Sequence, residues 1–320
     1  MGRCLYCFNE LNNGIYHPSC SRKLFGTPEP PVLEYTLDEL YSKARENAVA
    51  SAAVPGVQPK MSMAEISDNG RRKLTFVGLL GDYIMKPPSP DYPSLPENEA
   101  ATMKMAEAAG IATAPSGLLP LAYGELVYVT LRMDRAIIKG GRKISRIRHM
   151  EDFCQATEHM TEHKYLGSME MVAKTLRRYS SAPGFDLSIL LDMTLFIFFL
   201  TGNGDMHLKN FSLIYDGDEQ RLAPAYDMLS TRLVIPEKDD PEELALTLCG
   251  KKSNFKARDF MKFAETLGLS DKQYYTAIKR LSGRLPKILD VLNSSFLSEV
   301  QIAAYKRLIS ERLERLNIIP

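Results

Sequence analysis

Short stretches in which apolar and polar residues alternate dominate the first half of the chain. Residues 61–66 and 73–80 alternate in this way on either side of Asp68-Asn69-Gly70. Because Asn-Gly favours the tight turns that join antiparallel strands, this region predicts a β-hairpin. Residues 82–86 and 125–133 have the same period and predict further strands. The first half is therefore expected to contain a sheet.

Longer amphipathic stretches with helical periodicity dominate the second half. Residues 96–109 form such a stretch already in the first half, and Gly110 follows it as a helix stop. Beyond about residue 150 the pattern is helical, apart from residues 210–248, and residues 299–316 predict a charged helix near the end. A strand-rich part followed by a helical part predicts an α+β fold.

The most apolar run, residues 187–200, contains Asp192 and is too short and too polar to cross a bilayer. We expect it to form a buried helix. The first residues, MGRCLYCFNE, lack the apolar segment of a secretory signal, so a cytoplasmic protein without membrane contact is expected. The 40 basic and 39 acidic residues nearly balance, whereas proteins that bind nucleic acid directly usually carry a basic excess.

Three of the five cysteines lie within the first twenty residues. Cys4-x-x-Cys7 and His17-x-x-Cys20 form two pairs, each with the spacing of zinc ligands. In a segment this short a metal can replace a hydrophobic core, so residues 1–25 predict a unit that holds structural zinc. The alternative is a small hairpin with three reduced cysteines. The proline-rich stretch GTPEPPV separates these residues from the next predicted helix, which begins near Thr36.

Candidate phosphoryl-transfer residues occur in TGNGDMHLKNFSL, residues 201–213, and shortly after it. Asp205 follows two glycines, Asn210 lies five positions later, and Asp227 follows a predicted strand. Phosphoryl transfer needs a carboxylate near the acceptor hydroxyl and hard oxygen ligands for magnesium, and these residue types supply both. On spacing alone, a surface turn and a helix cap remain the alternative. Gly56 in VPGVQPK is a candidate for a loop that binds phosphate through its backbone. A plain turn is the alternative for this stretch as well.

Taken together, several stretches resemble the HipA family of bacterial toxin kinases over roughly residues 50–310. The matching stretches are VPGVQPK (54–60), YIMK (83–86), ENE (97–99), LRMDR (131–135), EDFCQA (151–156), GDMHLKNFSL (204–213) and AYDMLS (225–230).

This resemblance implies a bilobal protein-kinase-like fold, with an N-lobe at residues 33–135 and a helical C-lobe at 136–320. It implies that Asp205 is the catalytic base and that Asn210 and Asp227 bind Mg²⁺. The ATP-binding residues that it implies are Pro55, Gly56, Val57, Gln58, Pro59 and Lys60 in a phosphate loop, Lys86 with Glu99 as its candidate partner, Leu131, Arg132 and Met133 in a hinge, and His207, Lys209 and Tyr226 beside the catalytic loop.

The resemblance also implies a serine/threonine protein kinase that acts as the toxin of a toxin–antitoxin module. Its substrate would be an aminoacyl-tRNA synthetase or another translation protein. Its partners would include a DNA-binding antitoxin and a small protein that resembles the missing N-terminal subdomain. A small-molecule or lipid kinase and a catalytically silent binding subunit remain alternatives. Family members carry regulatory serines in the phosphate loop where this chain has Ala53 or Pro55, so regulation by loop phosphorylation is not expected.

Overall fold

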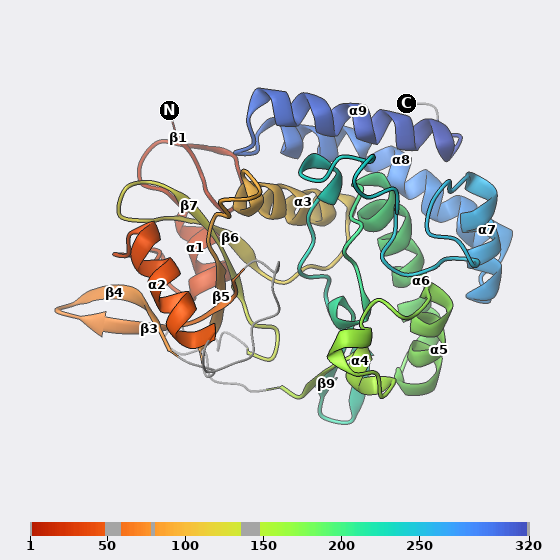
Figure 1. Cartoon of the computed structure of the whole chain (residues 1–320), viewed down its shortest axis with the longest axis horizontal. Coiled ribbons are helices and arrows are strands. Elements are labelled where there is room, and N and C mark those ends of the chain that lie inside the picture. Colours follow the sequence, from red (N-terminus) through yellow and green to blue (C-terminus); the bar gives the residue numbers. More distant parts are fainter. Residues whose placement is uncertain (1, 49–58, 78–80, 136–147, 319–320) are drawn as a thin grey trace. The chain divides into compact units, whose positions relative to one another are not determined.

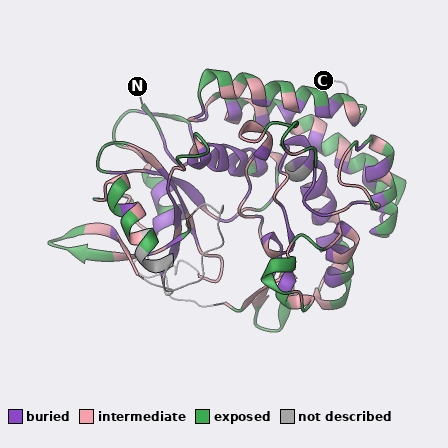
Figure 2. Cartoon of the chain, in the orientation of Figure 1, coloured by how far each residue is buried: buried purple, intermediate pink, exposed green. Residues whose placement is uncertain are grey.

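The computed structural model describes residues 2–48, 59–77, 81–135 and 148–318. Helices and strands form two compact units, and the predicted α+β class is confirmed (Figure 1). Helix α3 (Leu95–Ala109) contributes residues to both units and is buried along most of its length (Figure 2). The first unit comprises residues 1–100, 114–147 and 294–296, and the second comprises residues 101–113, 148–293 and 297–320.

An antiparallel five-stranded sheet with the order β4-β3-β5-β7-β6 forms the centre of the first unit. The predicted hairpin is present: Asp68 pairs with Arg71, and Asn69 and Gly70 both have positive φ, as a tight hairpin turn requires. The strands are β3 (Met61–Asp68), β4 (Arg71–Phe76), β5 (Tyr83–Lys86), β6 (Ser116–Pro120) and β7 (Leu126–Leu131).

The residues of the predicted metal unit pack directly on this sheet. The Leu118 N–H in β6 donates to the Leu5 carbonyl at 3.0 Å, and the Tyr16 hydroxyl donates to the Leu118 carbonyl at 2.9 Å. The Phe25 and Tyr83 rings lie 5.6 Å apart. These N-terminal residues therefore share the buried core of the sheet. Their elements, and the helix that follows, are β1 (Gly2–Arg3), β2 (Glu10–Leu11), α1 (Pro18–Phe25) and α2 (Leu37–Ala48).

Helices make up most of the second unit, together with the small antiparallel sheet β10-β9-β8. Its elements are β8 (Met150–Asp152), α4 (Phe153–Ala156), α5 (Met169–Tyr179), α6 (Pro183–Met193), the π-helical segment Thr194–Leu200, β9 (Ser212–Asp216), β10 (Glu219–Leu222), α7 (Ala257–Thr266), α8 (Asp271–Asn293) and α9 (Glu299–Arg315), with short 3₁₀ turns at Thr161–His163, Leu208–Asn210 and Thr231–Leu233.

The apolar run at residues 187–200 lies in α6 and the π-helical segment that continues it. Leu190 and Phe199 are fully buried, and the Phe199 ring lies 4.8 Å from the Phe260 ring. Asp192 lies at the edge of this helix and pairs with Arg280 of α8. The expected buried helix is thus present. Among the described residues, no helix combines the length and the apolar character needed to cross a membrane.

Candidate active site

Asp205 lies in the loop that follows the buried π-helical segment, and its carboxylate is held from one side. The Tyr165 hydroxyl donates to Asp205 Oδ1 at 2.6 Å. The backbone next to Tyr165 is also bonded to the loop that carries Asp205, because the Leu208 N–H donates to the Lys164 carbonyl at 3.0 Å. The bond from Tyr165 uses one carboxylate oxygen. Oδ2, the other oxygen, provides an acceptor that can orient an incoming hydroxyl.

Asn210 and Asp227 carry the oxygens that a magnesium ion prefers. Asn210 is buried, and its Nδ2 donates to the Asp205 carbonyl at 3.1 Å, so its amide oxygen is the atom that remains as a metal ligand. Asp227 has a positive φ of 58°. The Tyr226 hydroxyl donates to the Lys209 carbonyl at 2.8 Å. This bond joins the residue before Asp227 to the residue before Asn210, and thereby ties the two predicted metal ligands to each other.

His207 is a neutral residue of this loop. Burial lowers the pKa of its imidazole to about 4, although the nearby Asp205 carboxylate opposes this shift. Its ring packs edge-on against Tyr165, with the centroids 5.1 Å apart. At neutral pH it therefore contributes packing to the site rather than a positive charge.

Lys209 forms an ion pair with Asp152, with Nζ and Oδ2 2.8 Å apart. Asp152 also caps α4 in a capping box with Gln155. The Phe153 N–H donates to the Phe211 carbonyl at 3.0 Å. The EDFCQA stretch is therefore fixed, by an ion pair and a backbone hydrogen bond, to the segment on both sides of Asn210.

In the first unit, Lys86 and Glu99 form a buried ion pair. The lysine Nζ lies 2.6 and 2.7 Å from the two carboxylate oxygens, and the residues are only 4% and 2% exposed. Lys86 is at the end of β5 and Glu99 is in α3. Burial of two charges is costly unless both are paired, and here they are. Protein kinases use a lysine–glutamate pair of this kind to bind nucleotide phosphates.

The predicted hinge follows β7. The Leu131 N–H donates to the Pro115 carbonyl and the Arg132 N–H to the Asp82 carbonyl, each at 2.9 Å. These two donors are engaged within the first unit, which makes Met133 the better candidate for a backbone contact to adenine. In the predicted phosphate loop, Pro55, Gly56, Val57 and Gln58 lie outside the described residues, and Pro59 and Lys60 directly precede β3.

The four predicted zinc ligands come together. The ligand atoms of Cys4, Cys7, His17 and Cys20 all lie within 4.8 Å of one another. Cys7 Sγ is 3.4 Å from His17 Nδ1, and His17 Nε2 lies 3.0 Å from the Glu10 carbonyl. A hydrogen bond from the far ring nitrogen is the usual way in which a histidine ligand is oriented. Three sulfurs and one nitrogen are a donor set typical of structural zinc.

Two residues of this region were missed by sequence reasoning. Tyr165 lies forty positions before Asp205, and Thr231, whose hydroxyl contacts the catalytic loop, directly follows the AYDMLS stretch. A single tyrosine or threonine gives no periodic or spacing signal. Only the folded chain shows what each one contacts.

A family model described as the HipA-like C-terminal domain matches residues 52–289. The chain is 37% identical over 183 residues to Y4mE of Sinorhizobium fredii, a protein with a provisional kinase name, a match that covers 56% of this chain and 42% of that protein. It is 27% identical over 285 residues to the serine/threonine-protein kinase toxin HipA of Shewanella oneidensis, covering 82% of this chain and 63% of the toxin.

The fold agrees with these matches. The structure of Shewanella oneidensis HipA in complex with HipB and operator DNA superimposes with a TM-score of 0.70 at 23% sequence identity, covering 91% of this chain and 73% of that one. The chain spans less than two thirds of the length of the two relatives above. Since the family model covers most of the chain, and contains Asp205, Asn210 and Asp227, the protein belongs to the HipA-like C-terminal domain family.

Proposed function

We propose that this chain is an ATP- and Mg²⁺-dependent serine/threonine protein kinase and the toxin of a toxin–antitoxin module. Two hydrogen bonds carry the proposal. The Asn210 side-chain amide donates to the Asp205 carbonyl, and the Tyr226 hydroxyl, next to Asp227, donates to the Lys209 carbonyl. This arrangement joins the acceptor-orienting carboxylate to both candidate magnesium ligands. Such a set is what phosphoryl transfer requires.

Each of these residues has a distinct role in transfer. Asp205 orients the acceptor hydroxyl and takes its proton as the oxygen attacks the γ-phosphorus of ATP, while the bond from that phosphorus to the bridging oxygen breaks and ADP leaves. Lys86, held by Glu99, binds the nucleotide phosphates. Asn210 and Asp227 hold the magnesium ion, which when bound neutralises phosphate charge. Lys209, Tyr226 and the uncharged His207 support the loop that carries Asp205 and Asn210.

The proposed partners follow from the relatives. The Shewanella toxin is known in a complex with HipB and operator DNA, so we propose that this chain also binds an antitoxin that contacts DNA. Its net charge of +1 argues that the chain itself does not neutralise DNA phosphates. A small partner resembling the N-terminal subdomain and a cytoplasmic location are part of the same proposal. We propose an aminoacyl-tRNA synthetase, or another translation protein, as the substrate.

Labelling tests these assignments directly. The protein is incubated with γ-labelled ATP, Mg²⁺ and a bacterial cytosolic extract, and the label is traced by gel electrophoresis and phosphopeptide mapping. We expect label on serine or threonine of a translation protein. Label in a small-molecule or lipid fraction would favour the alternative kinase classes. Absence of any label, with ATP still bound, would favour a catalytically silent binding subunit.

The Lys86–Glu99 pair leads to a prediction on stability. Glu99→Gln removes the carboxylate from the buried Lys86–Glu99 ion pair, and breaking such a pair on one side is typically costly, so we expect the free energy of unfolding to fall by about 3–5 kcal/mol. The double variant Lys86→Met with Glu99→Leu removes both charges and should recover most of this loss, but it should not bind ATP tightly. Urea denaturation and calorimetric ATP titration measure the two effects. A double variant that remains as unstable as Glu99→Gln would contradict this account.

A second prediction concerns the phosphate loop, in which Ala53 and Pro55 lie outside the described residues. Family members phosphorylate a loop serine, and the added charge of about −2 opposes nucleotide binding. This chain has no hydroxyl at either position, so its intact mass should not increase after long incubation with ATP and Mg²⁺. Ala53→Ser should restore autophosphorylation and reduce transfer. Stoichiometric phosphate on the unmodified chain would point to another acceptor, with Ser51 and Ser62 as the first residues to map.

We also propose that Cys4, Cys7, His17 and Cys20 hold a structural zinc ion. Their convergence within 4.8 Å and the contact of His17 Nε2 with the Glu10 carbonyl support this assignment. Four protein ligands would complete a tetrahedral shell, and closed shells of this kind are structural rather than catalytic.

A further inference from the structure

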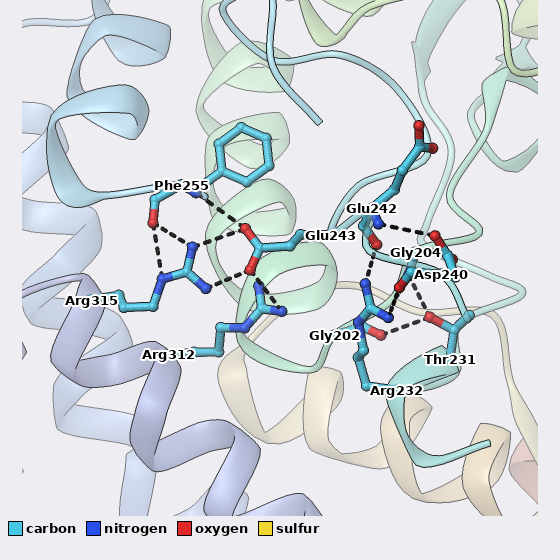
Figure 3. Close-up of polar contacts among 10 residues, drawn as sticks. All are labelled: Gly202, Gly204, Thr231, Arg232, Asp240, Glu242, Glu243, Phe255, Arg312 and Arg315. Atoms are coloured by element: carbon cyan, nitrogen blue, oxygen red, sulfur yellow. Dashed lines mark hydrogen bonds and ion pairs between the residues drawn. The ribbon is translucent and has the colours of Figure 1, made fainter. Parts of the chain in front are cut away.

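Thr231 contacts the backbone of the catalytic loop from a segment far along the chain. Its Oγ1 accepts the Gly204 N–H at 2.9 Å and donates to the Gly202 carbonyl at 3.0 Å (Figure 3). The Thr231 N–H also donates to the Gly202 carbonyl, at 3.1 Å. Thr231 is only 8% exposed. The Thr231 side chain thus bonds to both Gly202 and Gly204, the two glycines of the Gly-x-Gly stretch that precedes Asp205.

The two glycines allow this close approach. Gly202 has a φ of 63°, and a Cβ built there would lie 2.9 Å from Cγ of Arg232. A Cβ at Gly204 would lie 3.0 Å from Thr231 Oγ1, which is tighter than ordinary van der Waals contact. The Gly-x-Gly spacing before Asp205 therefore matches a surface on which Thr231 and Arg232 pack.

Arg232 holds Thr231 against the loop from the other side. Its guanidinium donates to the carbonyls of Asp240 and Glu242 (Figure 3). The next residue, Glu243, is buried; one carboxylate oxygen lies 3.1 Å from Arg312 and the other 2.9 Å from Arg315, both in helix α9. The contact to the catalytic loop is thus continuous with the well-packed C-terminal helix.

Thr231 also lies only four residues after Asp227. The bonds of Thr231 to Gly202 and Gly204 therefore fix the segment that carries one candidate magnesium ligand to the segment that carries the catalytic carboxylate. Phosphoryl transfer depends on the relative placement of these groups, and a displacement of about 1 Å can reduce a rate about a hundredfold.

We propose that Thr231 is a positioning residue whose hydroxyl keeps Asp205 and Asp227 in the geometry that transfer requires. This inference rests on the proposed kinase function. Thr231 itself acts through the Gly202–Gly204 backbone. Loss of the hydroxyl leaves the Gly204 N–H without its acceptor, and the loop should relax around Asp205.

The test compares three variants. Thr231→Val keeps the side-chain shape and removes the hydroxyl, and Thr231→Ser keeps the hydroxyl. Thr266→Val is the matched control. This threonine is exposed at the end of α7, and its hydroxyl donates to the Lys262 carbonyl within the same helix. The readouts are kcat and KM for hydrolysis of Mg-ATP by water, the melting temperature, and hydrogen exchange of the Gly204 amide.

For Thr231→Val we expect kcat to fall by about tenfold to a hundredfold, with KM for Mg-ATP changed by less than about threefold. Its Gly204 amide should exchange faster. Thr231→Ser should stay within about threefold of the unmodified protein in kcat, and Thr266→Val should match the unmodified protein. An unchanged kcat in Thr231→Val, or an equal loss in the serine variant, would overturn the proposal.

The exchange measurement separates this inference from the proposed function. If the unmodified protein does not hydrolyse or transfer phosphate from ATP, the kinase assignment fails, and the role in positioning fails with it. If the unmodified protein is active but the Gly204 amide exchanges equally in all variants, the kinase assignment remains and the contact from Thr231 does not hold the loop.

Discussion

Asp205→Asn should lower the rate of phosphoryl transfer by at least about a hundredfold and leave the fold intact. The substitution keeps the size of the side chain. It also keeps an oxygen that can accept the hydrogen bond that the Tyr165 hydroxyl donates to Asp205 Oδ1, at 2.6 Å, in the unmodified protein. It removes the carboxylate that accepts the proton of the attacking hydroxyl. Loss of a general base typically lowers a rate by about 10²–10⁴-fold. Radiolabel transfer from ATP measures this loss, and the melting temperature reports on the fold.

Two further variants make this result specific. Asp227→Asn replaces a predicted magnesium-binding carboxylate with a neutral amide, so it should weaken Mg-ATP binding in calorimetric titration, whereas Asp205→Asn should bind Mg-ATP almost normally. Asp218→Asn is the control for charge alone, because Asp218 lies exposed in the turn between β9 and β10. The assignment of roles is wrong if the Asp205 and Asp227 variants both keep full activity, or if Asp205→Asn loses nucleotide binding as severely as Asp227→Asn.

The elements predicted from local signals are present in the structure. Asn69-Gly70 forms the hairpin turn, and α3 ends before Gly110, which has a φ of 84°. Such features depend on a few neighbouring residues with strong conformational preferences, so the sequence alone is informative. The Lys86–Glu99 pair was also anticipated, but from the family resemblance rather than from spacing, because the path of the proline-rich stretch that joins β5 to α3 cannot be predicted from its residues.

Contacts between distant segments could not be predicted in this way. Tyr165 reaches Asp205, and Thr231 reaches Gly204, through the tertiary fold, and neither side chain belongs to a recognisable pattern. The packing of residues 2–25 on β6 is a further example. Their few apolar side chains suggest a separate metal-bound unit, yet Leu5 and Tyr16 bond to Leu118 of the sheet. A linker rich in proline says nothing about which surface the preceding residues cover.

Zinc in the N-terminal residues should consequently stabilise more than residues 1–25. We expect about one zinc per chain in protein purified without chelator, measured by elemental analysis. Cys4→Ser removes a fully buried ligand and should abolish zinc binding. Zinc-finger peptides gain an apparent free energy of about 10–16 kcal/mol from the metal, so the loss should unfold the metal unit. It should also expose the face of the sheet around Tyr83, against which Phe25 packs.

Hydrogen exchange can distinguish this extended effect from a local one. The Leu118 amide donates to the Leu5 carbonyl, so it should exchange faster in Cys4→Ser and after chelation. The Leu222 amide of the second unit donates to buried Asp186 and should stay protected. Cys249→Ser, at a half-buried thiol outside the cluster, should retain both zinc and protection. Metal-free protein in which the Leu118 amide is fully protected would show that packing on the sheet, rather than a metal ion, maintains the N-terminal residues.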